Sequence, residues 1–215
     1  MKKGRNKLLI AICLFVAFVG WTVLVRLVDV RPIGPQGSNV GFSTVNGAFH
    51  RMTGVHMMLY TITDWLGLVP IAVALGFAVL GLCQWIQRKS ILRVDRSILV
   101  LGGFYLVVMA VYLFFEMVVV NRRPVLIEGY LEASYPSSTT MLVLCVMPTA
   151  MLQFRDRIKK CAVRRCVLLI IAAFTAFMVI GRLLSGVHWI TDIIGGGLIS
   201  ASLVMAYVSI VYPKT

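Results

Sequence analysis

Long apolar runs constrain the fold of this chain more than any other feature. A transmembrane helix needs about 20 consecutive, mostly apolar residues, and six stretches with little or no charge approach or exceed that length. They are residues 8–25, 65–87, 97–115, 140–154, 167–181 and 193–213. The stretch at residues 97–115 extends to Val120 only if Glu116 is accommodated inside the protein. We therefore predict an all-α membrane protein with six transmembrane helices.

The overall composition excludes a soluble enzyme. Of the 215 residues, 60% are hydrophobic and 13% are charged, whereas soluble domains average about 45–50% apolar and about 25% charged residues. One core cannot bury this excess of apolar side chains, and a disordered chain would be far more polar. We expect residues 1–215 to form a single membrane-embedded domain.

The net charge of +13 has two interpretations. In a soluble protein it would favour a nucleic-acid partner, whereas in a membrane protein basic residues gather in cytoplasmic loops. The distribution favours the second, because 15 of the 21 Lys and Arg residues fall on one side of the predicted spans. These are Lys2, Lys3, Arg5, Lys7, Arg88, Lys89, Arg93, Arg96, Arg155, Arg157, Lys159, Lys160, Arg164, Arg165 and Lys214. We predict both termini in the cytoplasm, no nucleic-acid partner, and a bacterial plasma membrane, which short loops and a basic start would suit.

Three loops are predicted on the opposite side, at residues 29–64, 121–138 and 182–192. The first is rich in glycine and proline and is expected to be irregular or interfacial. Arg122, Arg123 and Arg182 lie on this side, at the ends of apolar helices. Basic residues there are not explained by orientation and indicate function; the alternative is that each snorkels to lipid headgroups.

His188 and Asp192 are four residues apart, so on a helix they would share a face. A carboxylate bound to one imidazole nitrogen fixes the tautomer and leaves the other nitrogen free as a nucleophile or base. Ser137 and Ser138 open the fourth predicted helix, where backbone N–H groups bind anions; helix capping is the structural alternative for these hydroxyls. Arginines, a helix start and a histidine on one membrane face together indicate a phosphate site.

These residues resemble the motifs of the type 2 phosphatidic acid phosphatase family, whose members are six-helix membrane lipid phosphatases. The family motifs are Lys, six residues, Arg-Pro; then Pro-Ser-Gly-His; then Ser-Arg, five residues, His, three residues, Asp. This chain matches them with Arg123-Pro124, with Pro136-Ser137, and with Arg182, His188 and Asp192. The third match keeps both spacings.

The resemblance implies a site at the extracytoplasmic ends of helices 3–6. His188 would be the nucleophile that forms a phosphohistidine, with Asp192 orienting it. Arg182 would act in catalysis and also hold phosphoryl oxygens together with Arg123, Ser137 and Ser138. The implied substrate is a lipid phosphate, and no metal or other cofactor is implied.

Two motifs depart from the family pattern. Glu116 stands where the family has lysine, and Ser138-Thr139 stand where it has Gly-His. The missing histidine would protonate the leaving group, and loss of a general acid costs about 10²–10⁴-fold in rate. A diphosphate substrate would lose less, because its leaving phosphate needs little protonation.

Several nearby residues are hypothetical substitutes. Arg122 would replace the lysine charge, and Glu116 would pair with an arginine. Candidate proton donors are Glu128, Glu132, His50 and His56. The sequence thus predicts a metal-independent lipid phosphatase acting on a phosphate monoester or diphosphate, with a phosphatidate-type lipid or an isoprenyl diphosphate as candidate substrate. The alternative is a catalytically weakened member that binds or transports a phosphorylated lipid.

Overall fold

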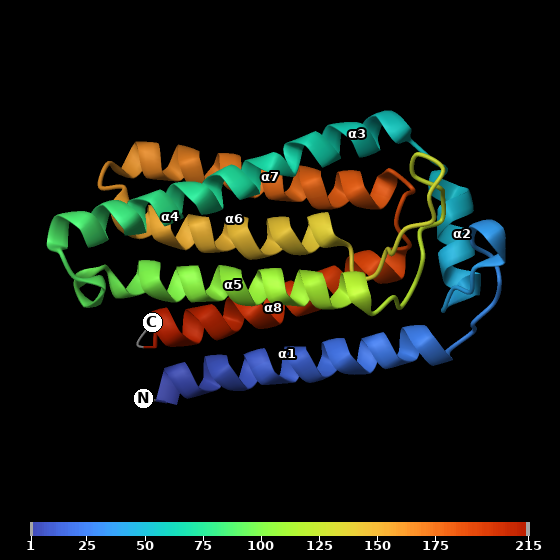
Figure 1. Cartoon of the computed structure of the whole chain (residues 1–215), viewed down its shortest axis with the longest axis horizontal. Helices are drawn as coiled ribbons and strands as arrows, with labels where there is room; N and C mark the ends of the chain where they lie inside the picture. The colour runs from blue at the N-terminus through green and yellow to red at the C-terminus, as the bar shows by residue number, and fades with distance from the viewer. Residues whose placement is uncertain (1, 214–215) are drawn as a thin grey trace.

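The computed structural model describes residues 2–213, and long helices dominate this part of the chain. Six helical segments run side by side along the long axis of the molecule (Figure 1). They are α1 (Lys2–Leu27), α3 (Met57–Leu66) continued by α4 (Leu68–Arg88), α5 (Arg96–Met117), α6 (Ser138–Arg157), α7 (Cys161–Leu184) and α8 (Ile190–Val211). The prediction of a six-helix membrane fold is confirmed.

Five of these segments are long and apolar enough to cross a membrane, within the part of the chain that the structure describes: α1, α3 with α4, α5, α7 and α8. The sixth, α6, lies in the middle of the bundle (Figure 1) and packs against α7, α8, α4 and α5. Thr149 and Gln153 of α6 are buried, and Gln153 Nε2 donates to the Tyr207 hydroxyl at 2.7 Å. A helix surrounded by other helices satisfies polar groups within the protein, which explains why the apolar run at residues 140–154 is short.

The first of the three loops predicted on the side opposite the basic segments is more ordered than expected. Within residues 29–64 the chain forms a short turn at Pro35–Gly37, the helix α2 (Ser43–Thr53) and all but the last two residues of α3. Helix α2 lies across the end of the bundle (Figure 1), and Gly54 ends it with a φ of +69°. The second span therefore begins at Met57 rather than at residue 65.

Both termini of the described chain lie at one end of the bundle, as do the loops that follow α4 and α6 (Figure 1). The basic segments predicted to share one side do share one end, apart from Lys214, which lies outside the described residues. Asp95 ties this end together through Arg88 at 2.9 Å and Arg157 at 3.2 Å. The three loops predicted on the other side meet at the opposite end, here called the site end.

Tyr135 anchors the loop between α5 and α6 at the site end. Its ring lies directly on Gly195 of α8, where a Cβ atom would come within 2.5 Å of the ring. Its hydroxyl is 2.7 Å from that of Thr22 on α1. The absence of a side chain at Gly195 therefore lets the loop pack against α8, and this packing places Ser134 beside the start of α8.

Candidate active site

His188 is buried in the turn that joins α7 to α8. Its Nδ1 lies 3.1 Å from the carbonyl oxygen of Ser134, and because a carbonyl oxygen only accepts, Nδ1 carries the proton. Burial, together with the positive charges of Arg123 and Arg182, lowers the pKa of His188 to about 4 even though Asp192 opposes the shift. The imidazole is therefore neutral at pH 7, and its Nε2, which has no hydrogen-bond partner, carries a free lone pair.

Asp192 is fully buried but does not contact His188 in the predicted way. His188 precedes α8, so the two residues do not share a helix face, and the nearest carboxylate oxygen lies 3.8 Å from Nδ1. That oxygen accepts from the Ser134 hydroxyl at 2.7 Å and from the Trp189 amide at 2.9 Å. Asp192 thus holds the segment that holds His188, and its charge is close enough to stabilise a cationic imidazole.

Arg182 lies in the last turn of α7 and is 1% exposed. Its Nη2 donates to Asp64 Oδ1 at 2.6 Å and also to the Thr139 hydroxyl. Its guanidinium carbon lies 4.9 Å from the ring centre of Tyr60. Nε and Nη1 are buried without a hydrogen-bond partner, so these donors are free to bind an anion.

Arg123 approaches the same tyrosine from the loop between α5 and α6. Its guanidinium carbon lies 5.8 Å from the ring centre of Tyr60, and its Nε pairs with Glu132 at 3.0 Å. Its Nη1 is buried without a hydrogen-bond partner. Buried donors without partners are rare in folded proteins. Together with the neutral His188, on which both positive charges act, two such arginines are suited to binding a phosphoryl group.

The start of α6 completes this group. Ser137 is fully buried immediately before the first helical residue, its amide donates to the Asp192 carbonyl at 3.2 Å, and its hydroxyl has no partner. Ser138 begins the helix and lines a small cavity with His188, Tyr112 and Glu116. The first N–H groups of a helix lack intrahelical partners, and they add positive potential beside the arginines.

Two residues were proposed to compensate for the missing family lysine, and they have different surroundings in the structure. Arg122 Nη1 donates to the Leu131 carbonyl at 3.0 Å, and its own carbonyl accepts from Trp189 Nε1 at 2.7 Å, so Arg122 braces the loop. Glu116 lines the His188 cavity. Within residues 2–213, no ion pair joins Glu116 to an arginine, contrary to our hypothesis.

The four hypothetical proton donors also have defined positions. Glu132 pairs with Arg123. His50 packs against Trp189 with ring centres 5.5 Å apart, and burial lowers its pKa. The Nε2 of His56 lies 2.9 Å from the Thr53 carbonyl, and Glu128 sits in a turn with a φ of +50°. Of the four, only Glu132 contacts one of the predicted phosphate-binding arginines, as its ion-pair partner.

Sequence reasoning missed Tyr60 and Asp64, which lie four residues apart on α3. Both contact Arg182. An acidic residue beside an apolar span is a functional signal, but Asp64 was assigned to the end of a loop because the span was started one residue later. The role of the Ser134 carbonyl could not be predicted, because a backbone group has no signature in the sequence.

The comparisons with known proteins concern the family and the fold. Residues 110–215 match the model of the PAP2 superfamily. Among solved structures, the chain is similar to a transmembrane PAP2-type phosphatidylglycerolphosphate phosphatase from Bacillus subtilis, with 18% identity, a TM-score of 0.54, and coverage of 95% of this chain and 96% of that chain. At this identity the likeness shows the fold alone. No curated protein matches.

The fold is that of an integral membrane protein. Residues 110–215, which contain the residues matched to all three motifs, belong to the PAP2 superfamily. This confirms the family predicted from Arg123, Ser137 and the third motif.

Proposed function

We propose that this chain is a membrane lipid phosphatase that uses His188 as its nucleophile. The observation that carries the proposal is the buried, neutral imidazole of His188 with a free Nε2. The guanidinium N–H groups of Arg123 and Arg182 that have no hydrogen-bond partner add to it. Arginine forks and helix N–H groups neutralise phosphoryl oxygens without a metal.

The reaction follows from these positions in two steps. The Nε2 lone pair attacks phosphorus, the bond from phosphorus to the lipid oxygen breaks with its electrons going to that oxygen, and a cationic phosphohistidine forms. Asp192, 3.8 Å from Nδ1, stabilises that cation. Water then attacks phosphorus, the bond to Nε2 breaks, and the imidazole returns to its neutral state as the water proton leaves.

The rate of hydrolysis at this site depends on the leaving group. Thr139 occupies the position of the family histidine, and its hydroxyl is bound to Arg182, so it offers no acidic proton. A lipid diphosphate releases a lipid monophosphate that needs little protonation, whereas a phosphate monoester releases an alkoxide that needs a proton. We expect diphosphates to be better substrates than monoesters.

A cavity next to the site supports a lipid substrate. An apolar cavity of about 490 Å³ lies between α4 and α5 and reaches Ser138 and Thr139 at the start of α6. It shares Tyr112 and Ser138 with the small cavity at His188. A hydrocarbon chain in this cavity would bring its phosphate to the arginines. Isoprenyl diphosphates, phosphatidate and phosphatidylglycerol phosphate are the candidate substrates.

One group of observations favours the alternative, a protein that binds or transports a phosphorylated lipid without hydrolysing it. Arg123 and Arg182 are each already paired with a carboxylate, and Glu116 lines the cavity where the family has a cation. This negative charge weakens the binding of a phosphate dianion. The alternative predicts lipid binding without phosphohistidine.

Phosphate release by the purified protein tests the proposal. Wild type and His188→Ala would be compared on an isoprenyl diphosphate, phosphatidate and phosphatidylglycerol phosphate, with and without EDTA. We expect release that requires His188, survives EDTA and is fastest with the diphosphate. No release from any of the three by folded protein that still binds them would support the alternative.

A further inference from the structure

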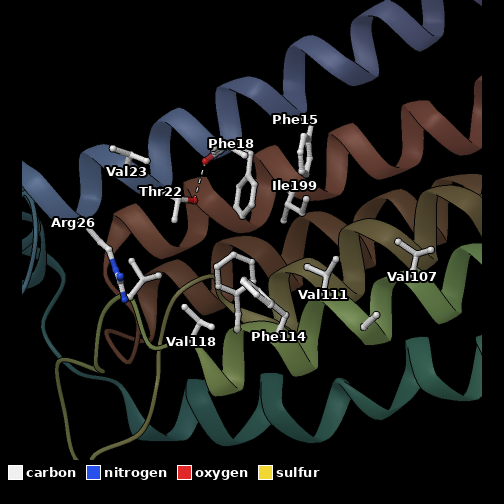
Figure 2. A pocket seen from close by; sticks show the side chains of 14 residues that line it. Phe15, Phe18, Thr22, Val23, Arg26, Val107, Val111, Phe114, Val118 and Ile199 are labelled. Atoms are coloured by element: carbon white, nitrogen blue, oxygen red, sulfur yellow. Dashed lines mark hydrogen bonds between the residues drawn. The ribbon is translucent and has the colours of Figure 1, made fainter.

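A second apolar groove lies on the other side of α5, between α1 and α5. Helix α1 packs chiefly on α8, which also contacts α5, so α1 and α5 leave a cavity of about 680 Å³ between them. Figure 2 shows Phe15 and Phe18 of α1 facing Val107 and Val111 of α5, with Ile199 of α8 beside them. The volume is within the range of about 300–1,000 Å³ that is typical of ligand sites.

The length of this α1–α5 groove matches one leaflet of a bilayer. Its lining on α1 runs from Phe15 to Arg26, and the eleven helical rises between these residues, at 1.5 Å each, give about 16 Å. Half of a hydrocarbon core of about 30 Å is about 15 Å. The groove therefore accommodates hydrocarbon over the depth of the leaflet at the site end.

The groove ends at a cation. Arg26 is the one charged residue in its described lining, and its guanidinium points from α1 towards the chain that follows α5 (Figure 2). There Nη2 donates to the Val119 carbonyl at 2.8 Å. A cavity of about 240 Å³ with a mixed lining begins at the same arginine, where Asn39, Gly41 and Asn121 lie among Val25, Val30 and Val120. An apolar groove, a cation and a cavity that contains polar groups thus follow one another in the order of an acyl chain, a phosphate and a headgroup.

We propose that the α1–α5 groove binds an anionic phospholipid of the site-end leaflet, with an acyl chain between α1 and α5 and the headgroup phosphate at Arg26. This site is distinct from the one at His188. The aromatic rings of Phe18, Phe115 and Tyr135 separate the two, with Phe115 5.9 Å from Tyr135 and Phe18 6.3 Å from Tyr135 between ring centres. The bound lipid would pack against Phe18 and Phe115. Their rings contact Tyr135, the residue next to Ser134, whose carbonyl holds His188.

Native mass spectrometry of the detergent-purified chain with added phosphatidylglycerol or phosphatidylcholine tests this proposal. Phosphatidylglycerol carries a phosphodiester, so the reaction proposed at His188 does not consume it, and binding is measured separately from hydrolysis. We expect one phosphatidylglycerol retained in preference to phosphatidylcholine. Arg26→Gln should reduce that retention about fivefold, the scale for one basic residue at a membrane surface, and should leave phosphatidylcholine unchanged.

Two adjacent residues of α5 provide a matched pair of variants that test whether the acyl chain lies in the α1–α5 groove. Val107 lines the α1–α5 groove and Leu106 lines the cavity between α4 and α5, and both are largely exposed in the isolated chain. Val107→Trp should lower phosphatidylglycerol retention and Leu106→Trp should not. Equal retention of both lipids would indicate annular lipid only and overturn the proposal. Retention that depends on Arg182 instead of Arg26 would place the lipid in the catalytic site and also overturn it.

Discussion

The Nδ1 atom of His188 lies 3.1 Å from the carbonyl oxygen of Ser134, closer than any carboxylate oxygen of Asp192, the nearest of which is 3.8 Å away. The backbone of the loop between α5 and α6 therefore sets the imidazole tautomer. Asp192 acts on the imidazole indirectly, because its carboxylate accepts hydrogen bonds from the Ser134 hydroxyl and the Trp189 amide.

This arrangement predicts a limited effect of Asp192→Asn. An asparagine oxygen can still accept from Ser134 and Trp189, so the melting temperature should change little. The rate should fall about 10²-fold, the scale for losing one stabilising group, because the negative charge near the phosphohistidine is gone. Steady-state turnover and thermal unfolding measure both effects. A loss near the roughly 10⁴-fold seen when a catalytic histidine takes the wrong tautomer would show that the carboxylate sets the tautomer.

Replacement of Arg182 by lysine should remove donors that bind phosphate. Lysine keeps the charge but cannot keep the bonds of Nη2 to Asp64 and Thr139 while offering N–H groups at the positions of Nε and Nη1. We therefore expect turnover to fall about 10²–10³-fold and vanadate inhibition to weaken. Arg155→Lys at the opposite end of the bundle, where Arg155 forms an exposed pair with Asp156, is the matched control. Equal vanadate inhibition in both variants would mean that Arg182 does not bind the phosphoryl group.

Thr139→His should restore the proton donor of the family motif. Thr139 is partly exposed to the cavity between α4 and α5, which leaves space for the larger ring. We expect monoester hydrolysis to rise about 10-fold or more, within the range for a general acid, and diphosphate hydrolysis to change little. The ratio of the two rates in wild type and variant measures this. An unchanged ratio would indicate that the missing histidine does not limit the reaction.

The pKa of His188 predicts a pH dependence of stability. Its ordinary value is 6.5, and burial lowers it to about 4 in the folded chain. Between pH 6.5 and 4 the unfolded chain binds a proton that the folded chain does not, so His188 makes the folded state less stable as the pH falls through this window. Thermal unfolding at pH 7 and pH 5 should show a smaller decrease for His188→Asn than for wild type. The asparagine amide can still donate to the Ser134 carbonyl, so an equal decrease in both would argue against a buried, neutral histidine.

Much of the fold could be predicted because hydropathy reports directly on lipid contact. The helices that face lipid are strongly apolar, and their existence was clear from the sequence. Helix α6 was marginal for a physical reason, since its buried Thr149 and Gln153 bond to other protein groups. Helix α3 was missed because Thr63 and Asp64 look like loop residues until Arg182 is seen to bind Asp64.

The candidate site was predicted only in part. Arg123, Ser137, Arg182 and His188 could be identified because charged and hydroxyl side chains stand out at the ends of apolar spans. Their partners come from other segments, Asp64 from α3 and Glu132 from the loop, and no spacing in the sequence relates them. The α1–α5 groove depends on how α1 and α5 both pack against α8, which only the folded chain shows.

Trapping of the phosphoenzyme tests the central claim most directly. Wild type and His188→Asn would be mixed with a lipid diphosphate labelled with ³²P in its terminal phosphate, quenched in alkali within milliseconds, and digested for mass spectrometry. Our account predicts an alkali-stable, acid-labile phosphate on the peptide that contains residue 188 in wild type and none in the variant. Turnover of the same lipid by wild type without label at His188, or equal labelling of the variant, would contradict it.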